Sequence, residues 1–230
     1  MGEYSYTMTT SIVGTDDGRE TYEIRRTFDV EGKSAVLIAL YPTVSLLNPI
    51  KMDSSTMYLL NHMHELGYND IRIVNLFSKV FERKPSLKQL RESQDNTSHI
   101  ESLLDKVKAD SMDIIIAWGS SMKRNKLSNE IKLQILERIR DKGLEKYVKE
   151  LTSVELEQET LCPHMLWIGL HCQDTWITRP VKIDTILEDM GETLNPVVKE
   201  QPVKRKRGRK KKLQEEANET VNKENTVNEG

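Results

Sequence analysis

Cysteine is scarce in this chain of 230 residues, which contains only Cys162 and Cys172. So few thiols exclude the disulfide framework of a small secreted domain and are typical of a reducing compartment. The sequence also lacks any run of eighteen apolar residues, and residues 1–14 do not have a basic segment followed by an apolar one. We therefore expect a cytoplasmic protein with no membrane partner.

Several catalytic and cofactor-binding motifs are absent as well. No G-x-x-x-x-G-K-[ST] or G-x-G-x-x-G loop occurs, which excludes the usual phosphate cradles of nucleotide hydrolases and dinucleotide-binding proteins. Gly119-Ser120-Ser121 lacks the second glycine of a nucleophile elbow. The sequence therefore predicts no cofactor.

Four potential zinc ligands have the unusual spacing C-x-H-x6-H-C: Cys162, His164, His171 and Cys172. The apolar residues between them are typical of a strand, and seven strand residues at ~3.3 Å each would separate the two halves by roughly 23 Å. A zinc ion holds its ligands at about 2.0–2.3 Å. We therefore predict no metal site.

Four nearly continuous apolar runs have the β-branched and aromatic content of strands that are buried on both faces: 35–40, 71–77, 112–119 and 164–170. Helical patterns lie between or after them, at 57–66, 100–107, 131–139 and 144–151. This alternation predicts an α/β fold, with a mostly parallel sheet and helices on both faces.

The two ends of the chain differ from this central pattern. Residues 8–13 and 21–28 alternate between apolar and polar, which predicts a hairpin at one edge of the sheet. Residues 193–230 lack apolar periodicity and predict a disordered tail. We therefore expect one α/β domain at 1–192, followed by this tail.

The tail has a charge opposite to that of the rest of the chain. Residues 204–230 contain nine Lys or Arg and five Glu, so they carry +4 and residues 1–203 carry −6, for a net charge of −2. Eight of the cations lie in one nine-residue run: Lys204, Arg205, Lys206, Arg207, Gly208, Arg209, Lys210, Lys211 and Lys212. A run of this kind predicts contact with the phosphates of DNA or RNA.

The centre of this run, Arg207-Gly208-Arg209, resembles an AT-hook. In that motif the glycine lets the backbone lie deep in the minor groove of A·T-rich DNA. The motif usually has proline after the second arginine, where this chain has Lys210. Non-specific polyanion affinity and, in a eukaryotic host, a nuclear localisation signal are the alternatives.

Polar residues follow the predicted strands at the edge where open α/β sheets bind ligands. The expected crevice residues are Tyr41, Thr43, Ser45, Asp53, Asn75, Trp118, Gly119 and Ser120. Asp53, Asn75 and His171 are the candidate catalytic residues. The alternative is that these side chains only form turns and helix caps, with Asp53 or Ser54 as an N-cap.

The pieces NLF at 75–77 and AWG at 117–119, with LIALYPTVS and DNTSHI, carry a family resemblance. Over roughly residues 20–180 the chain resembles the bacterial and phage family called domain of unknown function 1643. Tyr41 stands where that family has asparagine, and its closing histidine is missing from residues 178–182. The layout also resembles uracil-DNA-glycosylase-type folds, a likeness of fold that implies binding rather than cleavage, because both chemical positions are altered.

These observations favour a nucleic-acid-associated protein from a phage or mobile element, which binds DNA or RNA through its tail. An enzyme that acts on a nucleobase or nucleotide is the first alternative. A regulatory factor that binds a protein partner is the second.

Overall fold

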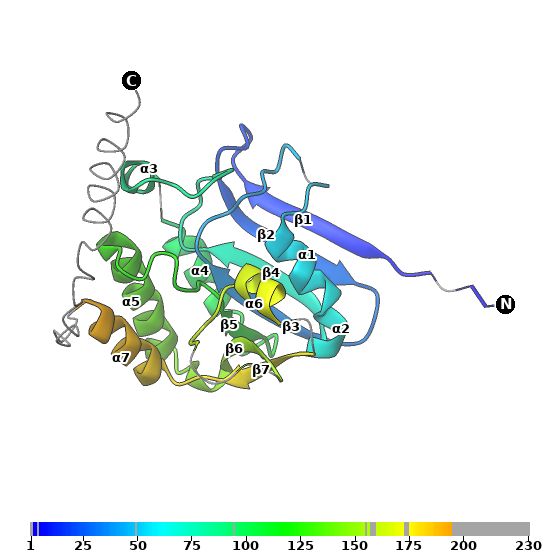
Figure 1. Cartoon of the computed structure of the whole chain (residues 1–230). Coiled ribbons are helices and arrows are strands. Elements are labelled where there is room, and N and C mark those ends of the chain that lie inside the picture. The colour runs from blue at the N-terminus through cyan, green and yellow to red at the C-terminus, as the bar shows by residue number, and fades with distance from the viewer. Residues whose placement is uncertain are drawn as a thin grey trace, which may run out of the picture. The chain divides into compact units, whose positions relative to one another are not determined.

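The computed structural model describes residues 2–3, 5–48, 50–93, 95–154, 156, 160–172 and 175–194. The predicted tail beyond Leu194, including the run 204–212, lies outside these residues. The described part contains a seven-stranded sheet with the order β1-β2-β4-β3-β5-β6-β7 (Figure 1). The strands are β1 (Met8–Gly14), β2 (Thr21–Phe28), β3 (Lys33–Ala39), β4 (Tyr68–Asn75), β5 (Asp113–Ile116), β6 (Val148–Ser153) and β7 (Trp176–Pro180).

Helices cover both faces of the sheet, as predicted. One apolar cluster joins the sheet to α1 (Ser54–Asn61), α2 (Met63–Leu66) and α6 (Met165–His171). A second cluster, on the opposite face, joins it to α3 (Leu87–Arg91), α4 (Thr97–Leu104), α5 (Lys126–Asp141) and α7 (Ile183–Leu194). Along β3, alternate residues belong to the two clusters, which explains why its sequence is continuously apolar.

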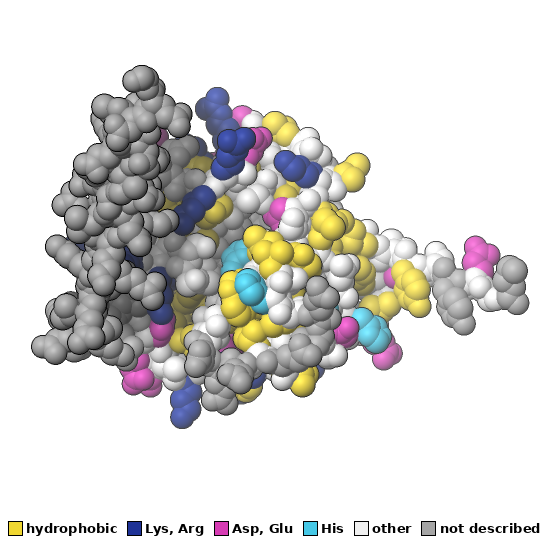
Figure 2. Space-filling view, viewed as in Figure 1, with side chains coloured by type: hydrophobic (Ala, Val, Ile, Leu, Met, Phe, Trp, Pro, Cys, Tyr) yellow, Lys and Arg dark blue, Asp and Glu magenta, His cyan; other side chains and the backbone are white. Residues whose placement is uncertain are grey.

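The α1 and α6 face also has an apolar outer surface. Figure 2 shows hydrophobic side chains gathered over these two helices, where Met57 and Leu170 are exposed. None of the described helices is long and apolar enough to cross a membrane.

The sheet is mixed, so the prediction of a mostly parallel sheet is wrong. The β3–β4, β3–β5 and β5–β6 pairs are parallel, whereas β1–β2, β2–β4 and β6–β7 are antiparallel. The predicted hairpin, β1 and β2, does lie at one edge. The opposite edge is β7, a strand with too few apolar residues to stand out in the sequence.

The helix expected at 144–151 is instead a short 3₁₀ turn, Glu145–Tyr147, followed by strand β6. Val148 and Leu151 are three residues apart, as in a helical stripe, but they pack into opposite apolar clusters. Their spacing therefore reflects a strand that is buried on both faces, because successive strand residues point to opposite sides.

The strand expected at 164–170 is instead helix α6. Met165, Ile168 and Gly169 form its buried face, and the ring of Tyr58 on α1 lies where a side chain on Gly169 would have to be. A short apolar run has no periodicity that separates a strand from a helix. The distance predicted between the two halves of the four potential zinc ligands assumed a strand, so it is wrong too. Among the described residues, no group of three or more His, Cys, Asp or Glu could hold a metal ion.

Candidate ligand crevice

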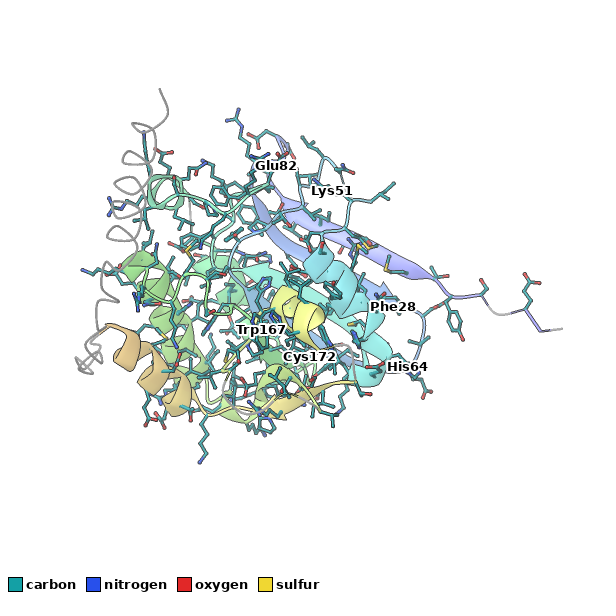
Figure 3. All side chains as sticks on the ribbon, viewed as in Figure 1. Phe28, Lys51, His64, Glu82, Trp167 and Cys172 are labelled. Carbon is teal, nitrogen blue, oxygen red and sulfur yellow. The ribbon has the colours of Figure 1, made fainter. Side chains whose placement is uncertain are left out.

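The order of the strands creates a crevice at one end of the sheet. The chain passes from β3 to its neighbour β4 and then crosses to β5 on the other side of β3. The connections that leave the carboxyl ends of β3 and β5 therefore diverge, which is where doubly wound sheets bind ligands. Lys51 and Glu82 mark the loops after β3 and β4 at this end (Figure 3).

Two cavities open there, with volumes of about 180 and 330 Å³, and we call them the first and second compartments. Ser121 and His164 line both, so the two compartments meet. Of the predicted crevice residues, Tyr41, Thr43, Asp53 and Asn75 line the first compartment, and Trp118, Gly119 and Ser120 line the second. Small-molecule sites typically have volumes of roughly 300–1,000 Å³, so the crevice has room for a small ligand.

Ser45 lines neither compartment. Its hydroxyl donates to the carbonyl of Gly18, at 2.7 Å, and accepts from the backbone N–H of Leu47. Ser45 therefore ties the loop after β3 to the turn between β1 and β2. The structure therefore supports the alternative for Ser45, which is that its side chain only stabilises a turn.

Asp53 is both an N-cap and a crevice residue. One carboxylate oxygen accepts from the backbone N–H of Thr56 at 2.7 Å, and the other accepts from the hydroxyl of Thr43. These two bonds fix the orientation of the carboxylate at the start of α1. Because Asp53 also lines the first compartment, the cap presents negative charge to any ligand there.

Asn75 is the last residue of β4 and is only 5% exposed. Its carboxamide makes no hydrogen bond with another residue of the described ranges, although it lines the first compartment beside Ile24, Ala39 and Ile73. The polar atoms of this carboxamide face the compartment, where water or a ligand can reach them. A ligand with both a donor and an acceptor would satisfy it.

The imidazole of the crevice belongs to His164, not to His171. His164 caps α6, because its Nδ1 accepts from the backbone N–H of Leu166 at 3.2 Å. Burial lowers its pKa, and the carboxylate of Asp53 opposes that effect. His171 lines neither compartment: its ring stacks on Trp167, which Figure 3 labels on α6, and its Nδ1 lies 2.7 Å from the carbonyl of Trp167.

The second compartment contains Lys132, a residue of α5 that is 2% exposed. Its Nζ lies 5.3 Å from the centroid of the Trp118 ring and has no carboxylate partner in the described part of the chain. Burial lowers the pKa of the amine to about 8, although the nearby Cys162 and Asp189 oppose this shift, and Lys123 adds a smaller lowering effect. Lysine is rarely buried without a partner anion, so this side chain marks the compartment as unusual.

The neighbouring groups do not neutralise Lys132. Burial raises the pKa of the Cys162 thiol, which is therefore uncharged at neutral pH. Asp189 forms an ion pair with Lys123 at 2.6 Å. Cys162 therefore supplies no thiolate, and the carboxylate of Asp189, which acts on the amine through its charge, is shared with Lys123.

The sequence of this chain matches the model of one protein family, described as "Protein of unknown function (DUF1643)", over residues 21–160. The chain belongs to this family. No curated protein and no solved structure matches the chain. The DUF1643 match contains Asp53, Asn75, Trp118 and Lys132, and it ends before His164. The crevice is thus built from the family region together with the segment that follows it.

Gly119 explains how the DUF1643 region and the later segment meet. It has a φ of +62°, and its N–H donates to the carbonyl of Cys162 at 3.0 Å. A Cβ at this position would lie 2.8 Å from the Cβ of His164. Only glycine allows this close approach with this backbone conformation.

Gly119→Ala is therefore expected to lower the free energy of unfolding by about 2 kcal/mol, since a left-handed conformation is unfavourable for alanine and the new methyl group contacts His164. Urea denaturation followed by circular dichroism measures this change. Gly191→Ala is the control, because nothing lies near that helical glycine of α7, and it should stabilise by roughly 0.5–1 kcal/mol. Equal effects of the two variants would contradict the close approach at Gly119.

Proposed function

We propose that this DUF1643 protein is a nucleic-acid-associated protein, whose crevice receives a nucleobase or nucleotide and whose basic run 204–212 contacts phosphates. The observation that supports it best is Asn75, whose carboxamide lines a mainly apolar cavity and makes no hydrogen bond with another described residue. A carboxamide offers a donor and an acceptor side by side, the arrangement with which asparagine recognises the edge of a base.

The rest of the first compartment suits a flat, polar ring. Ile24, Ala39 and Ile73 supply apolar surface, while Tyr41 contributes an aromatic ring held edge-on against Phe81, with 5.8 Å between ring centroids. Proteins that bind extruded bases combine such apolar or aromatic contacts with hydrogen bonds to the base edge. The first compartment therefore has the components of a base pocket.

Exposed cations lie on the segments that lead to this end of the sheet. Lys51, Arg83 and Lys84 are exposed on the loops after β3 and β4, and Arg19, on the turn before β2, is exposed and paired with Asp17 at 3.3 Å. Backbone hydrogen bonds join these segments: Val80 donates to Arg19 and Phe81 donates to Pro42, each at 2.9 Å. Figure 2 shows Lys and Arg side chains along this edge of the molecule. Positive charge here supports approach of a phosphate backbone.

The run 204–212 would supply most of the electrostatic affinity. If all eight cations contacted phosphates, the logarithm of the affinity would fall with the logarithm of salt with a slope of about −7. The resemblance of Arg207-Gly208-Arg209 to an AT-hook favours the minor groove of A·T-rich DNA. RNA remains the alternative ligand for this run.

Two variants test the two parts of this proposal separately. Deleting residues 204–212 should reduce the salt slope for an A·T-rich duplex from about −7 towards zero in a gel-shift titration. Asn75→Ala should weaken the binding of free nucleosides about 10-fold in calorimetry and leave the salt slope unchanged. Asn61→Ala, at an exposed site on α1, is the control. An unchanged slope would contradict the role of the run, and unchanged nucleoside binding would contradict the pocket.

A second candidate function is an enzyme that acts on a nucleobase or nucleotide, with a glycosylase-like fold. Asp53 and His164 favour it, because a carboxylate and an imidazole line one compartment and the carboxylate acts on the pKa of the ring. Base release from single-stranded DNA should then fall by about 10² or more in Asp53→Asn, which keeps the cap. If none of the four common bases and no uracil is released from single-stranded DNA, the glycosylase function is eliminated.

A further inference from the structure

The second compartment has a composition that base recognition does not explain. Its polar lining includes two lysines, Lys123 and Lys132, and one carboxylate, Asp189, which is paired with Lys123 at 2.6 Å. The lining of the compartment therefore has one more cationic side chain than anionic ones. Trp118 lies on one side of the Lys132 amine and fixes its position.

A second buried polar side chain lines this compartment. Asn129 precedes Lys132 by three residues on α5, so the two side chains lie on one face of the helix. Its amide nitrogen donates to the carbonyl of Lys123 at 2.9 Å, which orients the carboxamide, while its Oδ1 is buried and accepts no hydrogen bond from the described residues. The residue is 4% exposed. A buried lysine and a buried amide oxygen that accepts no hydrogen bond from the described residues thus line the same cavity.

We propose that the second compartment is a phosphate-binding subsite, in which Lys132 binds the phosphate of a nucleotide and Asn129 accepts from a hydroxyl of its sugar. The compartments meet at His164 and Ser121, so one ligand can place its base against Asn75 and its phosphate against Lys132. Lysine acts as a point charge in many phosphate sites. The choice of a nucleotide as the ligand rests on the proposed function. The assignment of a phosphate to Lys132 does not depend on it.

Because the second compartment is small, at about 330 Å³, and meets the first, the ligand that fits best is a nucleoside monophosphate. A phosphodiester within a polymer would have to fit the chain on both sides of its phosphate into the same small volume. The subsite is therefore distinct from the run 204–212, which would contact the backbone of a long nucleic acid.

The first test compares the four common ribonucleosides with their 5′-monophosphates, using the full-length protein in titration calorimetry. The monophosphate should bind about 10-fold or more tightly than the matching nucleoside, as expected for a hydrogen bond to a charged group. Lys132→Met should remove this difference while preserving nucleoside binding. Lys126→Met is the control, since Lys126 lies on the same helix with its side chain 89% exposed. This variant should keep the difference in affinity between monophosphate and nucleoside.

A second measurement needs no variant. Acetic anhydride modifies neutral amines, so Lys132 should be acetylated at pH 8 if it can be reached from the compartment, and 10 mM inorganic phosphate should reduce this modification several-fold. Peptide mass spectrometry measures both sites in one sample, with Lys126 as the internal control. Either result alone would overturn the proposal: no protection of Lys132 by phosphate, or equal affinity for nucleosides and monophosphates.

The outcomes separate this proposal from the proposed function. Binding of nucleosides and monophosphates with equal affinity would leave the base pocket in place and refute the phosphate subsite. Protection of Lys132 by phosphate without any nucleoside binding would support the subsite and refute the nucleotide pocket.

Discussion

Lys132→Met is expected to raise the free energy of unfolding at pH 7 by about 2–3 kcal/mol. The buried amine has a pKa of about 8, against 10.5 for an exposed lysine, so burying its charged form destabilises the folded state. Methionine has a similar length and no charge to desolvate. The lost contact with the ring of Trp118 offsets part of the gain. Urea denaturation at low ionic strength measures the difference.

The stabilisation should depend on pH in a defined direction. Below pH 8 both the folded and the unfolded protein carry the charge, and the full penalty is present. Between pH 8 and 10.5 the unfolded chain binds more protons than the folded one, so the wild-type protein gains stability relative to Lys132→Met. The advantage of the variant should therefore largely disappear by pH 10.5.

Lys126→Met again provides the matched control, because its exposed side chain should alter stability by no more than about 0.5 kcal/mol. A destabilised Lys132→Met at pH 7 would mean that an anion compensates the buried amine in the protein without ligand.

Glu150→Ala is expected to lower the free energy of unfolding by about 3–5 kcal/mol. Glu150 lies in β6 and is 2% exposed. One carboxylate oxygen accepts from Arg179 of β7 at 2.7 Å, and the other accepts from the backbone N–H of Cys162 at 2.6 Å. The variant leaves a guanidinium and a buried N–H without their acceptor, and both losses are unfavourable.

Glu150→Gln separates the two contributions. The glutamine oxygen can still accept from Cys162, so this variant should lose roughly half as much stability as Glu150→Ala. Glu130→Ala, which removes an exposed ion pair with Lys126 at 3.8 Å, should have an effect below about 0.5 kcal/mol. Urea denaturation of all three variants measures the series, and equal losses for Glu150→Ala and Glu130→Ala would contradict the role of the buried pair.

The same variants report on the crevice. Cys162 precedes His164 by two residues and is buried, so loss of the Glu150 contact should expose its thiol. Reaction of Glu150→Ala with Ellman's reagent should be faster than that of the wild-type protein under native conditions.

Much of the α/β fold could be predicted because its central strands are apolar along their whole length. The runs at 35–40 and 71–77 and the alternating residues of the hairpin were interpreted correctly, since their patterns match one element each. The pattern at 144–151 and the run at 164–170 were not, because a strand buried on both faces and a short buried helix give similar sequences. The first error removed β6 from the predicted sheet, and the second added a strand where α6 lies. The sheet is less parallel than predicted because β2 pairs antiparallel with β4, and because β7, whose sequence has too few apolar residues to stand out, pairs antiparallel with β6.

The crevice was partly predictable for a related reason. Asp53, Asn75 and Trp118 follow or end strands, and topology alone places them at one end of the sheet. His164 was missed because its run was interpreted as a strand, which puts the histidine at the wrong end. Lys132 was missed although a signal existed: it lies three and four residues before Ile135 and Leu136, on the apolar side of α5. A lysine in such a stripe indicates a buried amine.

The boundary of the DUF1643 match has a practical consequence for work on this family. A fragment that stops at residue 160 would keep β6 but lose β7, and the backbone of β6 would become an unpaired edge beside the apolar Val148 and Leu151. Removal of α6 would at the same time bare Leu59 and the surface around it. Exposed edges of this kind recruit other chains. A fragment cut at that boundary would aggregate, and inactive precipitate would reveal nothing about the chemistry of the intact crevice.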